Sequence, residues 1–190
     1  MAELEGDGKR ELPVNPAQVP EKLQVDLAQP DRSFSDGAGA TLKNVSSQLV
    51  EKGIMPAMSS NDIPQTLAQA AKAMEGSNLG IPADHGLSSA SSVSTLLKAV
   101  GADVRQTMAI PDLHKQLTER NWQESEYNAD TKLRPGDLLF TSMDPNGRNV
   151  GIVGEDGKVY SHNFRVGKFV GREQWNSKFV SVMRAPTCEE

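Results

Sequence analysis

The stretch that decides the fold runs from residue 133 to residue 163 and reads LRPGDLLFTSMDPNGRNVGIVGEDGKVYSHN. Short apolar runs alternate in it with clusters of Pro, Gly, Asn and Asp, which is the pattern of short strands joined by tight turns. The cluster Glu155-Asp156-Gly157 is typical of a hairpin turn, so the strands on either side of it are expected to pair. Together with the residues that follow, the pattern predicts strands at 138–140, 150–153, 158–163, 168–170 and 178–183.

Upstream of this stretch the spacing of the apolar residues becomes helical. Apolar residues from Leu67 to Met74 recur at the interval of one helix face, after a capping Asn61-Asp62 pair and before Gly76. The same kind of spacing predicts two more helices, from Ser88 or Ser89 to Gly101 and from Pro111 to Arg120. Because helices come first and an antiparallel sheet follows, the sequence predicts an α+β fold.

Residues 1–60 are expected to form a flexible N-terminal arm or linker. Up to residue 58 they are rich in Pro, Gly, Gln, Asp and Ser, so they offer little apolar surface to offset the entropy lost on ordering. One short helical pattern lies at 42–52, and the arm is therefore interpreted either as a linker or as a strap that docks on the folded part. The predicted domain covers 61–186, and residues 187–190 form a tail.

The composition excludes several classes of protein. With Lys+Arg 20 against Asp+Glu 25 the formal net charge is -5, so no basic surface for nucleic acid is expected. No apolar run is long enough to cross a bilayer, and the first residues lack the apolar stretch of a secretory signal. The one cysteine, Cys188, can form no intrachain disulfide and is interpreted as a terminal residue without a chemical role.

Three segments occur in an order that points to a family. Residues 86–94 read GLSSASSVS and are followed by Leu96-Leu97 and Gly101, residues 133–140 read LRPGDLLF, and residues 149–162 read NVGIVGEDGKVYSH. In this order they resemble the nucleophile helix, the Pro-Gly-Asp turn with its first core strand, and the catalytic hairpin of the NlpC-type, papain-like cell-wall cysteine peptidases and amidases. The resemblance spans residues 70–186.

The resemblance implies a papain-like fold with helices packed on a C-terminal antiparallel sheet. It also implies hydrolysis of an amide bond in peptidoglycan stem peptides or another peptide substrate. In the family a cysteine at a helix N-terminus is the nucleophile, a histidine takes its proton, and a third polar group orients the imidazole. The resemblance also implies a secreted or cell-envelope protein, whereas the residues themselves leave a cytoplasmic protein, a removed leader and export without a leader open. No cofactor or metal is expected, because the histidines show no metal-ligand spacing.

The chain departs from the family pattern at two positions. Ser89 stands at the position of the nucleophilic cysteine, because Ala90 and Val93-Ser94 align behind it. Asn149 stands at the position of the basic histidine, and an amide cannot accept and carry a proton at neutral pH. His162 on the returning strand becomes the base by default, with Asn149 orienting it or helping to hold the oxyanion. Ser161 is the fallback if the turn carries an extra residue.

Three explanations fit the serine at position 89. It is an introduced Cys→Ser change in an enzyme, it belongs to a natural pseudoenzyme or peptide-binding interaction module, or Ser89 and His162 form a serine hydrolase. The lack of an internal cysteine beside a motif that requires one favours the first. A secreted effector that uses the same chemistry on a host or competitor protein is a further alternative. A capped, polar-faced helix without chemistry is the alternative for the serine-rich segment itself.

Three residues are candidates for substrate binding. Tyr160 is expected to share a strand face with His162 and so to line a groove, whereas Ser88 and His85 lie at the start of the nucleophile helix. For His85 a solvated loop position is the alternative. Other residues are given structural roles: His114 on the surface and Asp137 in fixing its turn. Trp122, Trp175 and Phe164 are candidates for lining a substrate groove, but core packing is favoured for most of them.

Overall fold

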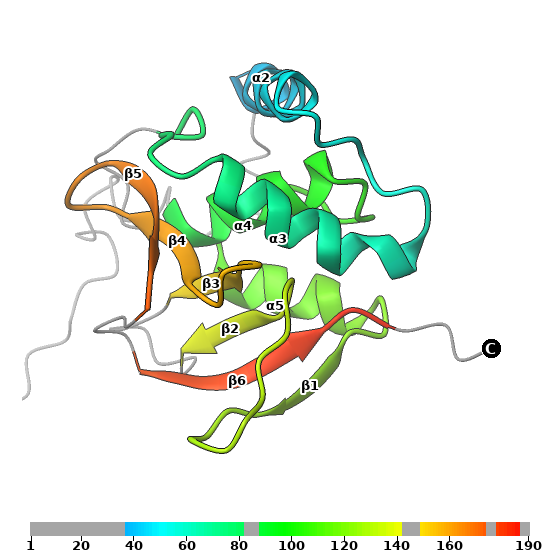
Figure 1. Cartoon of the computed structure of the whole chain (residues 1–190), viewed down its shortest axis with the longest axis vertical. Coiled ribbons are helices and arrows are strands. Elements are labelled where there is room, and N and C mark those ends of the chain that lie inside the picture. Colours follow the sequence, from blue (N-terminus) through cyan, green and yellow to red (C-terminus); the bar gives the residue numbers. More distant parts are fainter. Residues whose placement is uncertain (1–36, 82–87, 142–148, 174–177, 187–190) are drawn as a thin grey trace, which may run out of the picture. The chain divides into compact units, whose positions relative to one another are not determined.

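The computed structural model describes residues 37–81, 88–141, 149–173 and 178–186, all within the unit Phe34–Glu190 (Figure 1). Helices come first along the chain and strands last, so the predicted α+β class is confirmed. The helical elements are α2 (Gly37–Glu51), the short 3-10 helix η2 (Ser60–Asp62), α3 (Ile63–Ala73), α4 (Ser88–Ala99) and α5 (Ile110–Thr118). The strands are β1 (Gln123–Glu126), β2 (Leu138–Thr141), β3 (Val150–Val153), β4 (Val159–Asn163), β5 (Lys168–Arg172) and β6 (Phe179–Arg184).

The strands form one six-stranded sheet in the order β1-β6-β2-β3-β4-β5. Every neighbouring pair is antiparallel. The five strands and three helices predicted downstream of residue 60 are present, and the ends of all but β3 are shifted by one or a few residues. Strand β1 was not predicted, because its sequence QESE is polar and all four of its residues are exposed. It exists because it pairs with β6 at the edge of the sheet.

Helices cover one face of the sheet. Figure 1 shows α3 and α4 side by side above β3, and each of the two packs against that strand. Side chains alternate between the two faces of a strand, so Val150, Ile152 and Tyr160 join the main core beneath the helices. The opposite face carries a smaller buried cluster of Leu139, Val153, Val159 and Val182.

Helix α2 corrects the predicted extent of the N-terminal arm. The arm was expected to reach residue 60, yet α2 begins at Gly37 and packs against α4. Val45 and Leu49 are only 1% and 2% exposed and belong to the main core. Of the two interpretations of the arm, docking on the folded part is the one that describes this helix.

The Pro-Gly-Asp turn before β2 is fixed by close packing and by a partly buried ion pair. Gly136 has a φ of 86°, and a Cβ at this position would overlap the backbone of Pro64 at the start of α3. The Asp137 carboxylate accepts hydrogen bonds from the backbone N–H of Arg134, at 2.9 Å, and from Arg184 Nε, at 3.1 Å. Asp137 therefore fixes the turn, as predicted, and ties it to the end of β6.

The two edge strands of the sheet, β5 and β1, make different contacts. At β5, Phe169 exchanges backbone hydrogen bonds with the connection that follows α3, since Gly76 N–H donates to Phe169 O and Phe169 N–H donates to Ser77 O, both at 2.8 Å. At β1, the Glu124 carboxylate lies 3.1 Å from His114 Nε2 of α5. His114 was expected on the surface, but its ring also packs edge-on against Phe140 at 5.4 Å between centroids.

None of the helices in the described ranges is both long and apolar enough to span a bilayer.

Candidate functional site

Helix α4 carries Ser89 in its first turn and lies at the centre of the fold. Its apolar residues Ala90, Val93, Leu96 and Leu97 are fully buried, and its hydroxyl-bearing residues Ser91, Ser92, Ser94 and Thr95 are almost fully buried as well. The helix packs against α2, α3, α5, β3 and β4, so it is enclosed on nearly all sides. The first N–H groups of such a helix have no partners within the helix, and its N-terminal end is partially positive.

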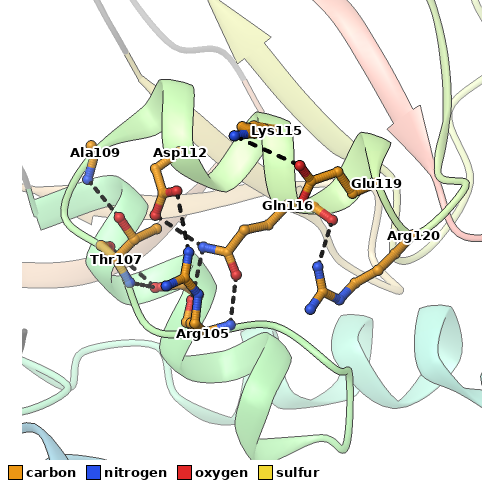
Figure 2. A network of polar contacts seen from close by, with 9 residues as sticks. Arg105, Thr107, Ala109, Asp112, Lys115, Gln116, Glu119 and Arg120 are labelled. Atoms are coloured by element: carbon orange, nitrogen blue, oxygen red, sulfur yellow. Dashed lines mark hydrogen bonds and ion pairs between the residues drawn. The ribbon is translucent and has the colours of Figure 1, made fainter.

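A polar network holds the connection between α4 and α5 (Figure 2). The buried Gln116 side chain accepts a hydrogen bond from the Arg105 N–H at 2.7 Å and donates one to Asp112 Oδ2 at 3.0 Å. On α4, Ser94 Oγ accepts a hydrogen bond from the Thr107 N–H at 3.0 Å. Because the backbone of this connection is bonded to both helices, the network fixes the position of α4 beside α5.

The helix and the hairpin that were expected to form the site do pack on each other. Helix α4 contacts both β3 and β4. The register pairs Ile152 with Tyr160, so residues an even number of places along β4 from Tyr160 face the same way. His162 therefore lies on the face of the sheet that the helices cover. Its cross-strand partner on β5 is Phe169.

The His162 side chain is enclosed, and its ring makes no hydrogen bond to the part of the chain that the structure describes. The residue is only 4% exposed, and neither ring nitrogen has a hydrogen-bond partner among the described residues. Burial lowers the pKa of His162 below its ordinary value of 6.5, because a charged imidazolium is disfavoured away from water. The imidazole is therefore neutral at pH 7, and it accepts a proton less readily than an exposed histidine does.

Ser89 and His162 do not form a hydrogen-bonded pair. Ser89 is 8% exposed, and its hydroxyl is not bonded to either imidazole nitrogen. The structure thus brings together the two elements that carry these residues, but it does not form the direct contact expected of a nucleophile with its base.

The Asn149 side chain is not bonded to His162 and so does not orient its ring. Its Oδ1 accepts hydrogen bonds from Ser161 Oγ at 2.9 Å and from the Val150 N–H at 3.0 Å. Ser161 also donates to the Val150 carbonyl at 2.7 Å. Ser161 is adjacent to His162 along β4, and neighbouring side chains in a strand point to opposite faces. The expected hydrogen bond from Asn149 to His162 is therefore not formed. A role for Asn149 in holding an oxyanion stays a prediction.

Tyr160 is a core residue, which corrects its assignment to a substrate groove. It is fully buried, stacks on Phe169 with 6.1 Å between ring centroids, and donates a hydrogen bond to Asp156 Oδ2 at 3.0 Å. Burial raises the pKa of the Tyr160 phenol, and the hydrogen bond to Asp156 raises it further. It does share a strand face with His162, but that face is covered by the core.

The other candidate residues divide into two groups. His85 and Trp175 lie outside the described residues, as do Cys188 and the side chain of Ser88. Trp122 is buried, as predicted for a core residue, whereas Phe164 is 58% exposed and so is not. The signal that could have placed Phe164 at the surface is its setting between Asn163 and Arg165 at a turn. Across the described ranges, no group of three His, Cys, Asp or Glu residues could hold a metal ion.

Comparisons with protein-family models, with curated proteins and with solved structures gave no match to this chain.

Proposed function

We propose that this chain is a non-cleaving relative of the NlpC-type cysteine amidases and endopeptidases, and that it binds cell-wall peptides without hydrolysing them. The observation that carries the proposal is that neither ring nitrogen of His162 bonds to Ser89 or to any other described group. A hydroxyl is a weak nucleophile unless a base takes its proton. A serine without that contact is suited to binding and not to turnover.

Two further features support binding without cleavage. Asn149 stands where the family has its base, and its oxygen is occupied by Ser161 and by the Val150 N–H. The N-terminal end of α4 offers N–H groups and a partial positive charge, which suit a peptide carbonyl or carboxylate. The peptide class itself comes from the resemblance of residues 70–186 to the family.

A second candidate is an enzyme that would cleave the same peptides with cysteine at position 89. The observation that favours it is the position of His162 on the face of β4 that the helices cover, because α4, which carries Ser89 in its first turn, packs against that strand. A thiol loses its proton far more readily than a hydroxyl, so it requires less help from the base.

One experiment separates the two candidates. The wild-type protein and the variants Ser89→Cys and Ser125→Cys are incubated with purified peptidoglycan peptides, and both binding and the release of new amine termini are measured. Ser125 is exposed on β1, so its variant controls for the addition of a thiol. We expect binding by all three proteins and release of amines by none.

Two results would reject the proposal. Amine release by Ser89→Cys alone, lost again when His162→Gln is added, would establish the enzyme with a missing cysteine. No binding by any of the three proteins would reject the cell-wall peptide as ligand. Circular dichroism of each variant verifies that it is folded.

A further inference from the structure

The turn between β4 and β5 exposes two large apolar side chains. Phe164 and Val166 are 58% and 57% exposed, and only Arg165 separates them in the chain. Single exposed apolar residues are common on protein surfaces, but a pair of them at one turn creates apolar area that a ligand can cover. The turn follows directly on β4, and Phe164 comes two residues after His162.

The turn has a defined conformation. The Arg165 N–H donates to Asn163 Oδ1 at 3.0 Å, and the Val166 N–H donates to the Asn163 carbonyl at 3.2 Å. Gly167 then takes a φ of 62°, which returns the chain into β5. A ligand that contacts a turn already closed by hydrogen bonds does not have to order it, so less of the binding energy is lost.

The turn is also basic within an acidic chain. From Lys158 to Arg172 the sequence contains basic residues and no Asp or Glu, whereas the whole chain has a net charge of -5. Arg165 and Lys168 are exposed at or beside the turn. The Arg165 guanidinium lies 5.9 Å from the centroid of the Phe164 ring, a cation–π distance that holds it over the ring. Arginine in a held position is well suited to recognising a carboxylate.

We propose that Phe164, Arg165, Val166 and Lys168 form a docking surface for a short peptide that carries a carboxylate beside an apolar side chain. The inference rests on the proposed function and names the class of peptide that the site accepts. A short peptide experiences mainly the local positive field of the turn, because screening limits electrostatic interactions to about 10 Å. An anionic membrane covers a wider surface than the turn alone, so it lies within this range of more of an acidic chain, which disfavours it as the occupant.

The test compares peptidoglycan peptides with free carboxylates and the same peptides after conversion of the carboxylates to amides. Binding to the wild-type protein and to Phe164→Ser, Arg165→Gln and Lys43→Gln is measured by calorimetry. Lys43 is an exposed lysine on α2, so its variant makes the same change of charge away from the turn. We expect Arg165→Gln to weaken binding of the free peptides about tenfold, Phe164→Ser about fivefold, and Lys43→Gln not measurably.

The effect of amidating the peptide is then compared with the effect of Arg165→Gln. Amidation should weaken binding to the wild-type protein by about the same factor as Arg165→Gln, and it should have little further effect on the variant, because both changes remove one contact. Equal binding of free and amidated peptides by the wild-type protein would overturn the docking surface and leave the proposed function intact. Failure to bind either form would reject the proposed function, and the docking surface with it.

The alternative occupant is tested in the same series. Vesicles of phosphatidylcholine and phosphatidylserine are sedimented with the wild-type protein and with Phe164→Ser. We expect no sedimentation with either. Sedimentation that depends on Phe164, combined with peptide binding that does not, would assign the turn to a lipid surface and overturn the proposal.

Discussion

The Arg184 guanidinium at the end of β6 lies 3.1 Å from the Asp137 carboxylate just before β2. Asp137 is only 4% exposed, and Arg184 also donates to the Lys132 carbonyl at 2.9 Å. This pair closes the Pro-Gly-Asp turn over the sheet. The Asp137 carboxylate is thus a charged group that little water can solvate.

Arg184→Met should therefore destabilise the fold strongly. Loss of the guanidinium leaves a buried carboxylate without its positively charged partner, with only the Arg134 N–H among the described groups still bonded to it, which costs about 3 kcal/mol of unfolding free energy. Urea denaturation measures the change, and Arg134→Met is the control because the Arg134 side chain is exposed and only its backbone N–H contacts Asp137. Equal stability of the two variants would show that the ion pair contributes nothing.

Gly136 and Gly157 provide a matched pair for the backbone. Both have positive φ values, of 86° and 76°, but a Cβ at Gly157 meets nothing, whereas a Cβ at Gly136 overlaps the Pro64 backbone. Gly157→Ala should cost about 1 kcal/mol from the strained φ alone. Gly136→Ala should cost clearly more than that, because α3 must shift away from the turn. Thermal denaturation of both variants provides the comparison, and equal losses would argue against a close contact between Gly136 and α3.

Helix α2 should contribute to stability through one face only. Leu49→Ala should lower the unfolding free energy by about 3 kcal/mol, since it removes a side chain that is 2% exposed in the main core. The neighbouring Val50 is 49% exposed, and Val50→Ala should change stability by less than about 0.5 kcal/mol. If Leu49→Ala were equally harmless in urea denaturation, α2 would not be docked on α4 in solution.

The buried imidazole of His162 should make the protein sensitive to acid. Burial lowers the pKa of His162 below 6.5, so the unfolded chain takes up this proton at a higher pH than the folded protein does. The free energy of unfolding therefore falls as the pH drops from above 6.5 towards the lowered pKa. His162→Phe removes the titrating group and should flatten this part of the pH profile.

Urea denaturation at a series of pH values from 7.5 to 5.0 measures this effect. Ser161→Ala, on the opposite face of the same strand, removes no titratable group. Its free energy of unfolding should therefore depend on pH with the same slope as that of the wild-type protein. An unchanged slope in His162→Phe would mean that another group is responsible for the loss of stability in acid.

Most of the fold could be predicted because the residues that determine each helix or strand lie within one short segment of the sequence. The segment at 150–153 is apolar or glycine throughout and is bounded by turn residues, so strand β3 was predicted with its exact ends. Strand β1 could not be predicted in this way, because nothing in QESE favours a strand except its pairing with β6. The start of α2 was missed because Gly37-Ala38-Gly39-Ala40 has no helical pattern of apolar residues.

The candidate site was less predictable because it depends on the register of two strands. The sequence places Ser161 and His162 side by side, but only the pairing of Ile152 with Tyr160 decides which of them faces the helices. The same pairing places the hydroxyl of Ser161 where Asn149 can bind it. The burial of Tyr160 and the exposure of Phe164 likewise depend on where the helices and the turn lie.

The connection after α3 has a consequence for association between copies of this molecule. It occupies the outward-facing backbone groups of Phe169, so a strand from another chain cannot align along the middle of β5 without first displacing it. The other border, β1, presents Glu124 and Glu126, which would repel the same residues of an identical copy. The fold is thereby protected against growing into continuous intermolecular sheets.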